Sequence, residues 1–124
     1  MADELILIVE DNEKNLKLAR DVLRFSGFRT IEAANATDGI ALAEAQLPAV
    51  ILMDIQLPDM DGVAALRRIR ESPATATIPI VALTAFAMGA DRERLLTAGF
   101  DGYLVKPIDI KQFPHQVRQF CRPT

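Results

Sequence analysis

The sequence predicts an α/β fold in which five strands alternate with five helices and form one parallel sheet. Two observations support this prediction. Short apolar runs recur along the chain, at residues 5–9, 29–33, 50–53, 80–84 and 102–105. The segments between them carry apolar side chains at helical spacing, so strand and helix patterns alternate over the whole chain.

Three of the runs are expected to be interior strands of the sheet. Leu5–Val9, Val50–Met53 and Ile80–Leu83 consist almost entirely of aliphatic residues, which is typical of strands buried on both faces of a parallel sheet. The runs at 29–33 and 102–105 mix apolar with polar residues, and this composition favours the two edges of the sheet.

A capping residue or a helix breaker bounds each expected helix. The limits are Asn12 and Gly27 for the first helix, Ala36 and Pro48 for the second, Asp61 and Pro73 for the third, Ala90 and Gly99 for the fourth, and Asp109 and Cys121 for the fifth.

Length and composition restrict the class of protein. The chain has 124 residues, of which 50% are hydrophobic and 25% charged, as in an ordinary globular domain. The net charge of −3 gives no basis for binding to nucleic acid or to an anionic membrane. No apolar run approaches the roughly 20 residues that span a bilayer, and the acidic, strand-like start of the sequence is not expected to be a signal peptide. A single cysteine, Cys121, fits a reducing compartment, so we expect a cytoplasmic protein without membrane insertion.

Polar side chains follow four of the expected strands at the point where each strand ends. Glu10 and Asp11 follow the first strand, Asp54 the third, Thr84 the fourth and Lys106 the fifth. Because ligands bind beyond the carboxyl ends of parallel strands, we expect these groups to converge at one edge of the sheet. Each residue alone also has a structural explanation, such as helix capping, but those explanations do not predict convergence.

The charges of this group indicate metal-assisted phosphoryl chemistry. Two carboxylates about 4 Å apart repel by roughly 4 kcal/mol at an effective dielectric near 20, so three must protonate in part or share a cation. Mg²⁺ binds through one or two carboxylates and usually meets a phosphate. A carboxylate nucleophile, a metal ion, a hydroxyl and an ammonium together suit phosphoryl transfer. Asp54, at the end of the middle run, is the most central candidate nucleophile.

Other kinds of site have little support. The sequence has no G-x-G-x-x-G after the first strand, no G-x-x-x-x-G-K-[ST] and no Cys/His metal cluster. His115, the only histidine, is expected to be exposed on the last helix. Cys121 lies in the apolar stripe of that helix and is expected to belong to the core.

Four motifs resemble the receiver domain of bacterial two-component response regulators, the CheY-like family. They are VEDN at 9–12, ILMDIQLPDMDG at 51–62, VALTA at 81–85 and YLVKP at 103–107. The resemblance covers the chain and implies a single receiver domain over 1–124 without an output domain. It also implies a doubly wound, flavodoxin-like sheet with strand order 2-1-3-4-5. The segments LILIVEDN and TAFAM are most similar to stand-alone receivers of the DivK type and to the receivers of hybrid kinases.

The resemblance implies a role for each residue of the expected site. Asp54 would be the phospho-acceptor, with a histidine kinase or a histidine phosphotransfer protein as donor. Asp11, Asp54 and the backbone carbonyl of Gln56 would bind Mg²⁺, for which Mn²⁺ can substitute. Glu10 would act partly through metal-bound water, and Lys106 would pair with the phosphoryl group.

Further residues would regulate this chemistry. Thr84 would be the switch hydroxyl and Tyr103 the switch aromatic side chain. Gln56 and Phe86 flank the acceptor and the switch threonine, where bulky groups would hinder the attacking water. The bond between Lys106 and Pro107 would be cis.

The family meets its downstream protein targets through the fourth helix, the fifth strand and the fifth helix. Pro114 departs from the family, which usually has a leucine-like residue there. Because proline inside a helix removes a hydrogen bond, the fifth helix either begins late, near Phe113, or is bent.

Three functions follow from these observations. The first is a signalling switch or relay component that catalyses only its own phosphorylation and dephosphorylation. The second is a Mg²⁺-dependent phosphohydrolase with an aspartate nucleophile. Such enzymes use a D-x-D motif, and in this sequence Gln56 occupies the position of its second Asp. The third is a receiver-like scaffold that binds proteins without phosphorylation. The presence of the complete set of phosphorylation residues argues against it: Asp11, Asp54, Thr84 and Lys106.

Overall fold

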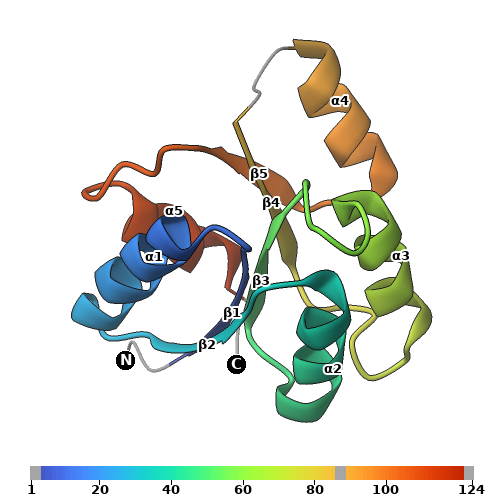
Figure 1. Ribbon diagram of the computed structural model, residues 1–124, viewed down its shortest axis with the longest axis horizontal. Helices are drawn as coiled ribbons and strands as arrows, with labels where there is room; N and C mark the ends of the chain where they lie inside the picture. Colours follow the sequence, from blue (N-terminus) through green and yellow to red (C-terminus); the bar gives the residue numbers. More distant parts are fainter. Residues whose placement is uncertain (1–3, 86–88, 122–124) are drawn as a thin grey trace.

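Five strands and five helices alternate along the chain, as the sequence predicts (Figure 1). The computed structural model describes residues 4–85 and 89–121. The elements are β1 (Leu5–Val9), α1 (Glu13–Phe25), β2 (Arg29–Ala33), α2 (Ala36–Gln46), β3 (Val50–Asp54), α3 (Gly62–Glu71), β4 (Ile80–Thr84), α4 (Gly89–Ala98), β5 (Gly102–Val105) and α5 (Phe113–Phe120).

The five strands form one parallel sheet in the order β2-β1-β3-β4-β5. This order confirms the predicted doubly wound topology, with β2 and β5 at the edges. The chain leaves β1 in one direction toward β2 and returns to add β3 on the other side of β1. The carboxyl ends of β1 and β3 are therefore neighbours at the point where the winding direction reverses, which is where such sheets bind ligands.

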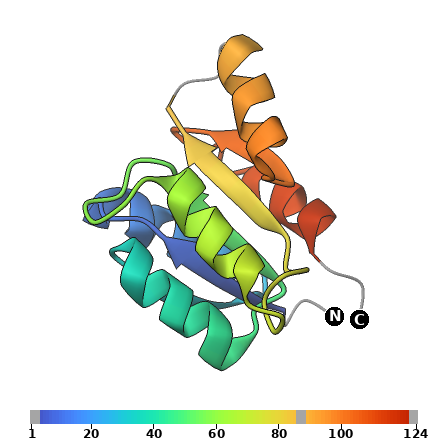
Figure 2. The same cartoon turned by 90° about the vertical axis from the view of Figure 1, so that its right-hand side faces the viewer.

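Helices cover both faces of the sheet. Helices α1 and α5 lie on one face, and α2, α3 and α4 lie on the other (Figures 1 and 2). Side chains of successive strand residues alternate between the two faces. In β1, Leu7 and Val9 join the core under α2 and α3, whereas Ile6 and Ile8 join the core under α1 and α5. β3 is therefore buried on both faces, and its last residue, Asp54, is fixed by a rigid strand.

Capping residues set the starts of α1 and α3 close to those expected, whereas α5 begins four residues after Asp109, and its N-cap, Gln112, makes no side-chain capping bond. The side chain of Asn12 accepts a hydrogen bond from the N–H of Asn15 at the start of α1, and Asp61 does the same for Ala64 at the start of α3. After α1 the chain turns at Gly27 with φ +96°, a conformation that favours glycine.

Helix α5 begins at Phe113, so Pro114 lies in its first turn, where proline is tolerated. This is the late start that the sequence left as one of two possibilities. The ring of Phe113 is buried, and the exposed His115 lies on the outer side of the same turn, as expected. Within the part of the chain that the structure describes, no helix combines the length and apolarity needed to cross a membrane.

Candidate functional site

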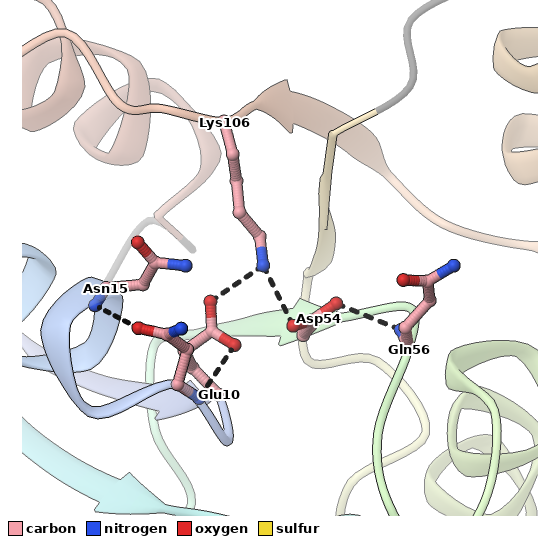
Figure 3. A network of polar contacts seen from close by, with 6 residues as sticks. Glu10, Asn15, Asp54, Gln56 and Lys106 are labelled. Atoms are coloured by element: carbon pink, nitrogen blue, oxygen red, sulfur yellow. Dashed lines mark hydrogen bonds and ion pairs between the residues drawn. The ribbon is translucent and has the colours of Figure 1, made fainter.

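Lys106 links the ends of three strands at the carboxyl edge of the sheet (Figure 3). Its Nζ donates to Glu10 Oε1 at 2.7 Å and to Asp54 Oδ2 at 2.8 Å. Its backbone N–H donates to the carbonyl of Thr84 at 2.8 Å, which fixes the end of β5 against the end of β4. The following peptide bond, to Pro107, is cis, as the resemblance implies. The predicted convergence of Glu10, Asp54 and Lys106 is therefore present in the structure.

Asp54 is held at both carboxylate oxygens. Oδ2 accepts from Lys106, and Oδ1 accepts from the backbone N–H of Gln56 at 2.9 Å. Only 6% of the surface of Asp54 is exposed, whereas Gln56 is exposed beside it. The loop after β3 thus orients the carboxylate and leaves the side of the site beside Gln56 accessible.

The two buried carboxyl groups, Glu10 and Asp54, differ in how readily they take up a proton. Burial and a hydrogen bond to Asp54 raise the pKa of Glu10 from 4.5 to about 7. Burial also acts to raise the pKa of Asp54, but hydrogen bonds from Glu10, Lys106 and the backbone N–H of Gln56 outweigh it and hold that pKa below its usual value. Burial acts to lower the pKa of Lys106, yet its bonds to Asp54 and Glu10 hold it above its usual value. Glu10 therefore takes up a proton first, and Asp54 is the group that stays ionised.

A hard divalent cation fits this set of groups. Carboxylate oxygens of Glu10, Asp11 and Asp54 all lie within 4.8 Å of one another. Asp11 is exposed, whereas the other two are buried. The ammonium of Lys106 bonds two of these three carboxyl groups, so a divalent cation would offset the negative charge that remains. Oxygen ligands and excess negative charge are what Mg²⁺ requires.

The other expected residues lie around this cluster. Thr84 ends β4 and is buried; it follows Leu83, the residue paired with Asp54 in the sheet. Tyr103 lies in β5 and is half-buried against the core under α3 and α4, with the guanidinium of Arg92 5.3 Å from its ring centroid. Phe86 lies outside the described residues.

Two contacts of the site were not predicted from the sequence. Glu10 accepts a hydrogen bond from Lys106, a pairing that the resemblance did not specify when it implied that Glu10 acts partly through metal-bound water. Asp59, in the loop after β3, binds the first turn of α2 through its carboxylate. No local pattern identifies these pairs, because their members lie far apart in the sequence.

The family model of the response regulator receiver domain matches residues 6–118. The chain belongs to this family. The receiver is 39% identical to the polar-differentiation response regulator DivK of Brucella anthropi over 115 residues, which are 93% of this chain and 94% of that protein. Its DivK relative in Brucella ovis is 38% identical over the same share of both chains.

Solved structures agree with this membership. The receiver domain of a sensor histidine kinase from Pseudomonas aeruginosa, with a magnesium ion coordinated in its active-site cleft, is 38% identical with a TM-score of 0.87. The alignment covers 96% of this chain and 98% of that one. The chemotaxis response regulator CheY4 of Vibrio cholerae shares the fold with a TM-score of 0.90 at 22% identity, over 96% and 99% of the two chains.

Proposed function

We propose that this receiver is a signalling switch that accepts a phosphoryl group on Asp54 from a phosphohistidine in a histidine kinase or histidine phosphotransfer protein. One observation carries the proposal: of the two buried carboxyl groups, Glu10 and Asp54, Asp54 is the one that stays ionised, and it is oriented by Lys106 and by the N–H of Gln56. Only an ionised carboxylate can act as the nucleophile.

In this reaction an oxygen of Asp54 forms a bond to phosphorus. The phosphorus–nitrogen bond to the donor imidazole breaks, and that nitrogen takes up a proton as histidine is released. Asp11, Asp54 and the backbone carbonyl of Gln56 would hold Mg²⁺, or Mn²⁺ in its place. The metal supplies positive charge for the phosphoryl oxygens when it is bound. Lys106 is already within hydrogen-bonding distance of Asp54 and would stabilise the remaining negative charge.

The output of the switch would pass through Thr84 and Tyr103. The buried hydroxyl of Thr84 would bind a phosphoryl oxygen, and Tyr103 would turn inward with it, shifting the population of two conformations. Gln56 is exposed beside the acceptor and would slow its hydrolysis by hindering water. Phe86, which follows the switch threonine by two positions in the sequence, would act similarly. The downstream target would be a protein, and not nucleic acid, and it would bind the surface formed by α4, β5 and α5.

We further propose that the protein acts in the cytoplasm and that residues 1–124 form one receiver domain. The relatives named DivK support this organisation, because this chain covers 94% of the B. anthropi protein. The phosphohydrolase alternative has less support, since Gln56 stands where such enzymes need a second acid. The scaffold alternative does not explain why the acidic cluster and Lys106 are assembled within hydrogen-bonding distance.

Intact-mass measurement after incubation with acetyl phosphate and Mg²⁺ tests the proposal. We expect the wild-type protein to gain the mass of one phosphoryl group and Asp54→Asn to gain none. Asp21→Asn, which removes an exposed carboxylate on α1, serves as the control and should be labelled like wild type. Labelling that persists in Asp54→Asn would rule out Asp54 as the acceptor. Release of phosphate from small phosphate esters would instead support the phosphohydrolase.

A further inference from the structure

The carboxylate of Asp59 joins the loop after β3 to the beginning of α2. Oδ1 accepts from the backbone N–H of Ala36 at 2.8 Å, and Oδ2 accepts from the backbone N–H and the hydroxyl of Thr37 at 2.9 and 2.6 Å. These bonds, the Thr37 hydroxyl foremost, lower the pKa of Asp59 to about 2. An ionised carboxylate at this position also interacts favourably with the helix dipole.

Helix α2 does not depend on Asp59 to begin. Its own N-cap is Asn35, whose side-chain oxygen accepts from the N–H of Asp38 at 2.8 Å. Backbone N–H groups of the first turn thus donate to two acceptors, Asn35 next to the helix and Asp59 in a distant loop. The bonds of Asp59 therefore serve to hold the loop as well as the helix.

The loop that Asp59 belongs to is closed on itself. The N–H of Gln56 donates to Asp54 Oδ1, the N–H of Gly62 donates to the carbonyl of Ile55 at 3.0 Å, and Gln56 pairs with Asp61 in an antiparallel bridge. A Cβ on Gly62 would lie 2.7 Å from the Cα of Ile55, so only glycine permits this closure. Hydrogen bonds within the loop consequently hold it together, with Asp54 at one end.

Helix α2 is in turn packed closely on β1. A Cβ on Gly39 would lie 2.8 Å from Val9 Cγ2, which shows how near the helix backbone comes to the end of the strand. Val9 directly precedes Glu10 and Asp11. A continuous set of contacts therefore runs from Asp59 through α2 to the strand that carries the other two acidic residues.

We propose that Asp59 is a positioning residue of the metal site, because it fixes the loop that carries Gln56 relative to the strand end that carries Asp11. This inference rests on the proposed function, in which the carbonyl of Gln56 and the carboxylate of Asp11 hold the same Mg²⁺. Without Asp59 the two ligands belong to parts of the protein that are joined more loosely. The metal must then bring them together, and its affinity falls.

An NMR titration of backbone amide signals with MgCl₂ tests this proposal. We expect Asp59→Ala to raise the Mg²⁺ dissociation constant about tenfold, as the loss of supporting groups typically does. The matched control is Asn35→Ala, which removes a cap from the same helix end but does not touch the loop. Its dissociation constant should stay within about twofold of wild type. Thr37→Val removes only one of the three hydrogen bonds, and it provides a milder variant if Asp59→Ala does not fold.

The comparison of the two alanine variants separates positioning from helix stability. Weaker Mg²⁺ binding in Asp59→Ala but not in Asn35→Ala, at similar losses of unfolding free energy, would support the proposal. Equal changes in both variants, or no change in either, would overturn it while leaving the proposed function intact. Failure of the wild-type protein itself to bind Mg²⁺ would overturn both.

Discussion

Replacing Glu10 by Gln should stabilise the metal-free protein at neutral and alkaline pH. Glu10 is 1% exposed, and its carboxyl group lies against Asp54 and Lys106. Its pKa rises from 4.5 to about 7 because of burial and then its hydrogen bond to Asp54. The folded protein therefore holds this proton more tightly than the unfolded chain does. The resulting stabilisation is complete below pH 4.5 and is lost as the pH rises through 7.

The size of the effect follows from the change in pKa. A rise from 4.5 to about 7, at about 1.4 kcal/mol for each unit of pKa, corresponds to about 3 kcal/mol in total. About 2 kcal/mol of this develops between pH 5 and pH 7. Gln resembles the protonated acid in shape and in hydrogen bonding, so Glu10→Gln keeps the contacts and abolishes the titration. The unfolding free energy of Glu10→Gln minus that of wild type should therefore grow by about 2 kcal/mol between pH 5 and pH 7.

Urea unfolding followed by circular dichroism, in EDTA and at intervals between pH 5 and pH 8.5, measures this difference. Glu44→Gln, which removes an exposed carboxylate on α2, is the control for the general effect of lost charge. Adding Mg²⁺ at pH 8 should stabilise wild type, because the cation offsets the negative charge of the cluster. A difference between Glu10→Gln and wild type that does not change with pH would refute this account of Glu10.

Two further predictions concern stability away from the acidic cluster. Leu47 caps the end of α2 with φ +48°, a left-handed conformation that is strained for leucine and tolerated by asparagine, and its side chain is 55% exposed. Leu47→Asn should therefore raise the unfolding free energy in urea by about 0.5 kcal/mol. Leu47→Ala retains the strain and should not raise it. Arg70 donates to the carbonyls of Ala76 and Ile78 and to Asp101, so Arg70→Met should lower that free energy by about 2 kcal/mol. Asp101→Asn, which keeps an acceptor for the N–H of Ile80, should cost less, and equal losses in both variants would contradict this reasoning.

Local patterns were sufficient to predict the strands and helices and the polar groups that follow the strand ends. Aliphatic runs mark strands buried on both faces, and capping residues such as Asn12 and Asp61 mark helix starts, because both signals depend on neighbours in the sequence. The position of Asp54 at the end of such a run predicted a carboxylate at the rim of the sheet. The motifs that resemble receivers supplied the strand order, which periodicity alone does not determine.

The tertiary structure decided how the charges are shared. Glu10 and Lys106 are separated by 96 positions, and only the packed sheet brings their charged atoms to 2.7 Å. Which carboxyl group holds the proton depends on burial and on hydrogen bonds from three different strand ends, and none of these is a property of a short segment.

The same distinction applies to Asp59. The sequence presents it as one acidic residue in a turn, with nothing to indicate a partner 23 positions away at Ala36. A hydrogen bond depends on the distance and direction between two atoms, and those are fixed only when α2 packs on β1 beside the loop. The sequence by itself determined which chemical groups this receiver carries and the strand ends where they lie. The folded chain alone determined which group is ionised and what holds the loop in place.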